Sequence, residues 1–272
     1  MPHRPLTASL FLSLLLGLAC LPANAQQPAG EAVFGNEELD QMLAPLALYP
    51  DALLAQVLMA ATYPGDVADA AAWSMEHPDA SGDDAVRQVS EQPWDPSVQA
   101  LVAFPAVLAT LGQDPAWVQR VGDAFLAQPD AVMDSVQRLR QQAKAAGNLE
   151  SSEQQKVSTV PASGGTQTII IEPADPQVVY VPSYDTTVVY GTWAYPAYPP
   201  AYYPPPPGYY FGGALAAGLG FAAGVAIIDS LWGDCDWNNG DIDIDVDRYN
   251  NLNVNRQIDR SRSNWQHNAV NR

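Results

Sequence analysis

The sequence predicts a mainly α-helical protein with a compact multi-helix N-terminal domain, a small β unit and largely disordered C-terminal segments. Three observations support this prediction. Apolar residues recur at helical spacing over residues 36–148. Short runs of β-branched residues follow in residues 168–193, where we expect two or three short strands. After residue 194 the composition shifts to Pro and Tyr, then Gly and Ala, then Asp and Asn.

The N-terminus has the organisation of a secretory signal peptide. A charged start precedes an apolar run over residues 10–21, and Ala23-Asn24-Ala25 fits cleavage by signal peptidase before Gln26. The run is shorter than the roughly 20 residues that span a bilayer, so a retained anchor is the weaker alternative. We expect residues 1–25 to be removed, residues 26–35 to be flexible, and the mature chain to act outside the bacterial cytoplasm.

Prolines mark the helix starts in residues 36–148. Proline fixes φ near the helical value and lacks the amide hydrogen that a first turn leaves unpaired, so it favours helix starts. We expect helices to begin near six of them: Pro50, Pro64, Pro96, Pro105, Pro115 and Pro129. Trp73, Trp94 and Trp117 lie in this domain, and we expect them in its core or packed in turns, with a ligand cage as the alternative.

The β unit follows a predicted linker. Residues 149–167 are rich in Ser, Gln, Thr and Gly without periodicity, which is typical of a flexible linker. Strands are then predicted over residues 168–172, 177–181 and 186–190. Neighbouring prolines limit ladder hydrogen bonding, so these strands are expected to be short or at edges. A sheet this small must dock on the helical domain or on another chain.

Several motifs occur in order within residues 38–195. They read LAPLALYPDALLAQ at 43–56, TYP at 62–64, WDPSV at 94–98, VQRLR at 136–140, YVPSYD at 180–185 and VVYGTW at 188–193. With these motifs the chain resembles the bacterial family known as domain of unknown function 3300. The resemblance implies an exported protein, in the periplasm or on the periplasmic face of an envelope membrane of a Gram-negative bacterium, and implies no specific activity. Thr186 departs from the family pattern, in which proline more often follows Tyr-Asp.

Three segments of unusual composition complete the chain. Residues 194–210 alternate Tyr and Pro, which predicts an extended polyproline path serving as a spacer or docking in an aromatic groove. Residues 211–232 are rich in Gly and Ala, and residues 211–228 carry no charge. For that stretch two interpretations stay open: a buried or loosely ordered helical hairpin, or membrane insertion or glycine-mediated contact between like subunits. Residues 233–272 are expected to form a disordered acidic and Asn-rich tail.

The acidic tail raises calcium binding as an alternative. Asp234, Asp236 and Asn238 begin like a calcium loop. Carboxylates then occupy alternate positions at Asp241, Asp243, Asp245 and Asp247. Asn239 stands where such a loop needs glycine, so a solvated acidic strand or a disordered segment is the primary expectation.

The sequence predicts no catalytic, cofactor-binding or metal site. His77 and His267 are far apart in the chain, which disfavours a histidine metal site or a catalytic triad. Cys235 has acidic neighbours that are expected to raise its pKa and weaken it as a nucleophile. An envelope hydrolase with converging carboxylates is the alternative, and its candidate residues are Asp51, Asp66 and Asp95.

The charge balance restricts the partners. The chain has 12 Lys and Arg against 30 Asp and Glu, a formal net charge of −18. Nucleic acid is therefore excluded as a partner, because binding phosphates needs a basic surface. We expect a non-enzymatic envelope scaffold or interaction protein that contacts an unknown envelope protein, like subunits or a membrane through its C-terminal half.

Overall fold

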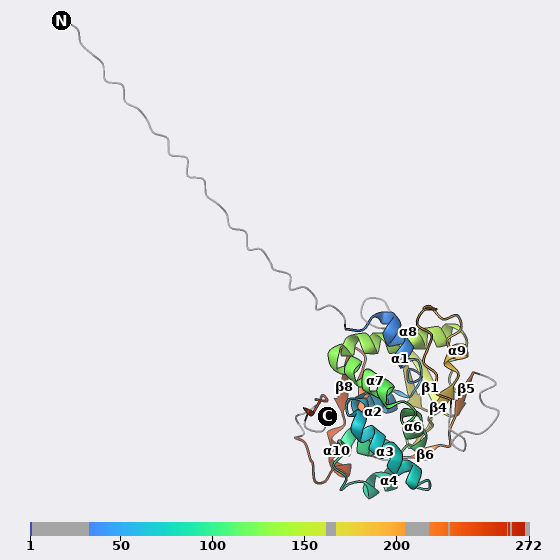
Figure 1. Cartoon of the computed structure of the whole chain (residues 1–272), viewed down its shortest axis with the longest axis vertical. Coiled ribbons are helices and arrows are strands. Elements are labelled where there is room, and N and C mark those ends of the chain that lie inside the picture. The colour runs from blue at the N-terminus through green and yellow to red at the C-terminus, as the bar shows by residue number, and fades with distance from the viewer. Residues whose placement is uncertain are drawn as a thin grey trace. The chain divides into compact units, whose positions relative to one another are not determined.

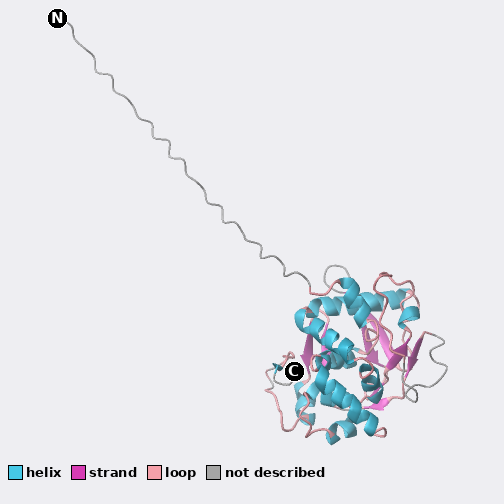
Figure 2. Cartoon of the chain, viewed as in Figure 1, coloured by secondary structure: helices cyan, strands magenta, loops and turns pink. Residues whose placement is uncertain are grey.

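The computed structural model describes Met1 and residues 33–161, 167–204, 218–227, 229–259, 261 and 263–269. Ala32–Arg272 form one compact unit, separate from Met1–Glu31. Beyond Met1, the predicted signal peptide lies outside the described residues. The described part of the chain is mainly helical, as predicted (Figure 1, Figure 2).

Eight helices make up the N-terminal domain in the described residues: α1 (Asn36–Leu43), α2 (Asp51–Ala61), α3 (Pro64–Glu76), α4 (Gly82–Gln88), α5 (Pro96–Leu101), α6 (Pro105–Leu111), α7 (Pro115–Ala127) and α8 (Pro129–Ala145). The six predicted starts are confirmed. Proline is the first residue of α3, α5, α6, α7 and α8, and Pro50 directly precedes α2. Helix α4 has no such proline and was not anticipated.

Helix α2 is the centre of the core. It is buried at every position except Ala52, as expected for a helix that is apolar on nearly all sides. It packs against α5, α7 and the later strand β7 (Gly233–Asp236). Helix α7 approaches it closely at Gly122, where an added Cβ would lie 2.1 Å from the Ala61 carbonyl oxygen. Glycine is therefore required at this crossing.

The predicted linker over residues 149–167 is wrong for residues 155–161 and 167, which lie in strands. β1 (Gln155–Pro161) pairs antiparallel with β2 (Gln167–Pro173), and residues 162–166 lie outside the described residues. The hairpin docks on the helical domain through β2, whose Ile169 and Ile171 are buried. The Gln137 side chain of α8 donates to the Ile169 carbonyl at 3.1 Å and accepts from its amide at 2.8 Å.

The small β unit differs from the predicted one in its pairing. β3 (Val178–Val179) pairs with β6 (Val225–Ala226), and β4 (Pro182–Tyr184) pairs with β5 (Leu219–Phe221), both antiparallel. The strand predicted over residues 186–190 is instead the short helix α9 (Thr186–Val189). Asp185 caps this helix by accepting a hydrogen bond from the Thr187 amide at 2.8 Å, which overrides the β-branched composition.

Strands β5 and β6 come from the Gly/Ala-rich segment. The helical hairpin predicted there is wrong for residues 218–227, which pair with β3 and β4, while residues 211–217 lie outside the described residues. Within the described residues, no helix has both the length and the apolar character needed to cross a bilayer.

The described part of the Tyr/Pro segment is held on the helical domain. The side-chain amide of Gln41 in α1 donates to the Pro199 carbonyl at 2.8 Å. The backbone carbonyl of Gln41 accepts from the Ala201 backbone amide at 3.0 Å. The Tyr203 ring packs against Trp117 with 4.3 Å between ring centroids and a tilt of 32° between the ring planes. Residues 199–204 therefore do not act as a free spacer.

The prediction of a disordered tail is wrong for Gly233–Leu252. β7 (Gly233–Asp236) and β8 (Asp241–Ile244) form a hairpin that is followed by α10 (Val246–Leu252). Side chains alternate between the two faces of a strand, so the acidic pattern also creates an apolar face. Cys235 and Ile242 on that face are buried, and β7 packs against α2.

Candidate functional site

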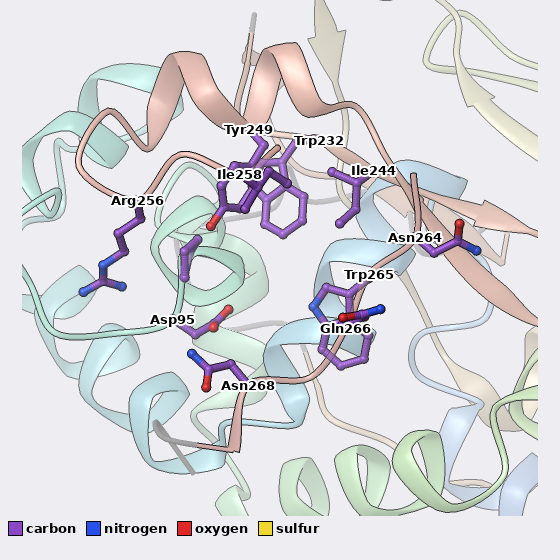
Figure 3. Close-up of a pocket in the computed structure, with 11 residues that line it drawn as sticks. Asp95, Trp232, Ile244, Tyr249, Arg256, Ile258, Asn264, Trp265, Gln266 and Asn268 are labelled. Atoms are coloured by element: carbon purple, nitrogen blue, oxygen red, sulfur yellow. The ribbon is translucent and has the colours of Figure 1, made fainter. Parts of the chain in front are cut away.

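A cavity of about 470 Å³ lies between the start of α5 and the C-terminal segment, residues 232–268 (Figure 3). Its size falls within the range of small-molecule sites. Asp95 and Pro96 line it from the helical domain. The other lining residues belong to the C-terminal segment: Trp232, Ile244, Tyr249, Arg256, Ile258, Asn264, Trp265, Gln266 and Asn268. We call it the C-terminal cavity.

Aromatic side chains form two sides of the cavity. Trp232 is only 2% exposed and contacts Tyr249 edge-on, with 4.9 Å between ring centroids. Trp265 is half-buried and lies 5.8 Å from the ring of Phe125 in α7. In Figure 3, Trp232 and Tyr249 lie above the central space and Trp265 lies below it. The Trp232 indole N–H is buried and donates to no described residue.

The polar side of the cavity is organised by Asp95, which is 7% exposed. Its Oδ1 accepts from the Ser97 amide at 2.9 Å and from the Ser97 Oγ at 2.7 Å, which caps α5. Its amide donates to Asp66 Oδ2 at 2.8 Å. The hydroxyl of Tyr63 lies close enough to the Asp95 carboxylate for that charge to raise the pKa of Tyr63. The hydrogen bonds from Ser97 fix the carboxylate beside the cavity.

The C-terminal segment is tied to the helical domain on both sides of the cavity. Arg256 Nη1 donates to the Trp94 carbonyl at 2.6 Å. The backbone amide of Asn268 donates to the Tyr63 hydroxyl at 2.8 Å. The His267 ring stacks on the Tyr63 ring with 4.9 Å between ring centroids. Both ring nitrogens of His267 are buried without a hydrogen-bond partner among the described residues. Tyr63 is therefore the main anchor for the end of the chain.

The electrostatic environment favours neutral side chains around Asp95. Burial raises the pKa of Tyr63, and the nearby Asp95 carboxylate raises it further. Burial also raises the pKa of Asp66, with an added contribution from the charges of Asp95 and Asp69. Tyr63 is accordingly a protonated hydrogen-bond donor at neutral pH. The arrangement offers hydrogen bonds and aromatic surface more than charge.

The comparisons with known proteins agree with the motifs. A family model described as Protein of unknown function (DUF3300) matches residues 35–267. The chain belongs to this family. The match extends beyond the motifs in residues 38–195 and includes every lining residue of the C-terminal cavity except Asn268. The cavity is thus built from the part of the chain that defines its family membership.

One relative of this DUF3300 chain is an uncharacterized protein, YacH, from Escherichia coli (strain K12). The two are 46% identical over 295 residues, which cover 88% of this chain and 48% of YacH. The chain therefore spans about half the length of this relative. No solved structure matches the chain.

The structure brings together two of the three carboxylates suggested for a hydrolase in this DUF3300 chain. Asp66 and Asp95 are linked as described above, but only Asp95 lines the cavity. Asp51 instead accepts from Arg140 Nη1 at 2.6 Å and from Trp237 Nε1 at 2.7 Å. Its charge is used in a buried ion pair, so the three carboxylates do not form one site.

The residues suggested for a calcium loop form the β7–β8 hairpin instead. Asp234 lies opposite Asp243, and Asp236 lies opposite Asp241. Asp236 accepts from the Asn238 amide at 3.0 Å, which stabilises the turn. Asp245 caps α10, and Asp247 lies within that helix. Within the described ranges, no group of three or more His, Cys, Asp or Glu side chains is arranged to hold a metal ion.

The other residues singled out in the sequence, His77, Trp94, Trp117 and Cys235, do not line the cavity. His77 is exposed at the end of α3 and stacks on Trp73 at 4.2 Å, as expected of a surface turn residue. Trp94 and Trp117 are buried in the core, as predicted. Burial, followed by the charge of Asp51, raises the pKa of Cys235 well above its ordinary value. The predicted direction is confirmed, although burial is a larger cause than the adjacent aspartates.

The sequence interpretation missed the residues that line the cavity from the C-terminal segment. The segment was assigned to disorder because of its Asp and Asn content. A usable signal was the recurrence of large aromatic residues in this polar context, at Trp232, Tyr249 and Trp265. Disordered segments are poor in such residues, so they indicate packing against a core.

Proposed function

We propose that this protein is an exported cell-envelope protein that binds a partner molecule in the C-terminal cavity and performs no catalysis of its own. The observation that carries the proposal is the cavity itself, about 470 Å³ in volume, in which aromatic side chains such as Trp265 and Tyr249 lie opposite the buried carboxyl group of Asp95. Cavities of this size that combine aromatic surface with a few placed polar groups are typical of small-molecule sites.

The rigidity of the cavity supports a binding role. Binding sites work best when their side chains are held in place by neighbouring contacts. The Asp95 carboxylate is fixed by two hydrogen bonds from Ser97, and the opposite side is tied down through Arg256. The lining is therefore preorganised, which reduces the entropy lost on binding.

A hydrolase has less support. General acid–base catalysis needs a group within hydrogen-bond reach of the substrate. Asp95 caps α5, Asp66 accepts the Asp95 amide, and Asp51 pairs with Arg140. Each carboxylate is engaged in a contact within the protein, and only Asp95 of the three lines the cavity.

Export is supported by the organisation of residues 1–25. Fractionation of cells followed by a carbonate wash tests the location, with N-terminal sequencing of the purified chain. We expect release with the periplasmic fraction or from the washed envelope, and a first residue of Gln26. An intact N-terminus in the cytoplasmic fraction would overturn this part of the proposal.

Tryptophan fluorescence tests binding, because Trp232 and Trp265 both line the cavity. The protein purified from cells that express the full chain is titrated with saccharides, short peptides, nucleotides and fatty acids. At least one class is expected to change the emission, to lose this effect in Trp265→Ala, and to be recovered chemically unchanged. Trp73→Ala, outside the cavity, is the matched control. The binding role fails if no class changes the emission or if the bound compound is converted.

A further inference from the structure

We propose that the C-terminal cavity binds a neutral saccharide, an inference that rests on the binding role proposed above. Three features of the lining point to this class of ligand. They are the aromatic rings in its walls, the amide side chains around it, and the small number of charged groups that face it. Each feature matches a different part of sugar chemistry.

The aromatic rings match the apolar faces of a sugar. A pyranose presents a patch of C–H groups on each face, which packs favourably on an aromatic ring. Trp and Tyr supply a flat apolar surface together with a polar N–H or O–H. Trp265 is half-buried and lines the cavity, so part of its surface is available to a ligand. Trp232 is almost fully buried and forms the wall behind the space.

The polar groups match sugar hydroxyls, which both donate and accept hydrogen bonds. An amide side chain also does both, through its NH₂ group and its carbonyl oxygen. Gln266 has an exposed side chain that makes no hydrogen bond to the described residues. The exposed Asn268 adds a second amide side chain to the lining. Together they provide the mixed donors and acceptors that neighbouring hydroxyls require.

The charges disfavour anionic ligands such as phosphates or nucleotides. Arg256 is the single basic residue among the lining residues, and its guanidinium already donates to the Trp94 carbonyl at 2.6 Å. Asp95 would repel an anion, and the chain as a whole carries a net charge of −18. A neutral saccharide avoids this repulsion and still uses Asp95 as an acceptor.

The size of the cavity limits the ligand to a short saccharide or to one end of a longer chain. A volume of about 470 Å³ lies in the lower half of the range for small-molecule sites. A disaccharide is therefore the appropriate probe. We would use cellobiose, maltose and N,N′-diacetylchitobiose, with trialanine as a neutral peptide comparison.

Isothermal titration calorimetry with these probes tests the inference on the protein purified from cells that express the full chain. At least one disaccharide is expected to bind. Trp265→Ala and Gln266→Ala are each expected to weaken binding about tenfold, because each removes a side chain placed against the ligand. Trp73→Ala is the matched control and should leave the affinity unchanged. Gln266 is exposed, so its variant tests the site even if Trp265→Ala disturbs the fold.

The outcomes separate this inference from the proposed function. If trialanine binds, the disaccharides do not, and Gln266→Ala weakens the peptide, the cavity is a peptide site and the saccharide inference is overturned while the binding role stands. If disaccharides bind equally well to wild type and to both cavity variants, the site lies elsewhere and the inference is overturned. If none of the probes binds and the fluorescence panel is also negative, both proposals fail.

Discussion

Arg140 of α8 and Asp51 of α2 form a buried ion pair, with 2.6 Å between Nη1 and Oδ1. The Arg140 side chain is fully buried, and its other nitrogens donate to the carbonyls of Ala47 and Tyr49 at 2.8 and 2.9 Å. The guanidinium also lies 4.8 Å from the centre of the Trp237 ring. Two of the family motifs, LAPLALYPDALLAQ and VQRLR, therefore meet at this ion pair.

Replacing Arg140 with Met should destabilise the protein strongly. The substitution leaves the Asp51 charge buried without its partner, which costs about 3 to 5 kcal/mol. Urea unfolding followed by circular dichroism measures the loss. Arg87→Met in α4 is the control, because Arg87 and its partner Asp84 are both exposed. A loss of about 1 kcal/mol is expected there. Equal losses in the two variants would contradict the structural role assigned to Arg140.

The close crossing of α7 over α2 gives a second prediction. In Gly122→Ala the new Cβ would meet the Ala61 carbonyl, so the helices must separate at a cost of about 1 to 3 kcal/mol. Gly65→Ala in the first turn of α3 is the control, because no atom lies within 4 Å of an added Cβ there. That variant should be neutral or stabilising by up to about 1 kcal/mol. Comparison of the two urea midpoints checks both values. A Gly122→Ala protein as stable as wild type would refute the close approach of α7 to α2.

Local signals in the sequence were sufficient to predict the helical domain. Proline acts on its own residue and its immediate neighbours, so Pro64 or Pro129 marks a helix start whatever the rest of the chain does. The pairing of β3 with β6 depends on residues about 50 positions apart, which local patterns do not encode. The cap from Asp185 to Thr187 is local but outweighed the β-branched composition that predicted a strand.

The candidate site was only partly accessible from the sequence. The sequence suggests Asp66 and Asp95 as hydrolase candidates only because they are acidic residues in the helical domain. The hydrogen bond between them arises because α3 and α5 pack together. The C-terminal segment was missed because its alternation of Asp with Ile was interpreted as a solvated strand. Ile242 on the opposite face is fully buried, so the same alternation places the hairpin on the core.

The folded tail can be tested at Ile242. Ile242→Ala removes a fully buried side chain and should cost about 2 to 5 kcal/mol in the free energy of unfolding. Val254→Ala is the control, because Val254 lies in the same tail with 68% of its surface exposed. Its effect should stay within about 0.5 kcal/mol. If Ile242→Ala unfolds with the wild-type midpoint, the tail does not contribute to the core.

The raised pKa of Asp66 predicts how stability changes with pH. Because burial raises this pKa above its ordinary value of 3.8, the folded state binds a proton at a pH where the unfolded chain has lost it. The contribution of Asp66 therefore becomes less favourable as pH rises from 3.8 through the folded pKa. Asp66→Asn removes this dependence and keeps an acceptor for the Asp95 amide. We expect Asp66→Asn to be more stable than wild type at pH 7, with the difference shrinking toward pH 4.

Urea unfolding of wild type and Asp66→Asn at several pH values measures that difference directly. Asp79→Asn is the control, because Asp79 is exposed in the loop after α3. It should leave the pH dependence of wild type unchanged. A difference between Asp66→Asn and wild type that grows as the pH falls would mean that Asp66 is stabilised as a charged group. The charge of Arg256, which lowers the pKa of Asp66, would then make Asp66 a charged partner of the C-terminal segment. The neutral character assigned to this side of the cavity would be wrong.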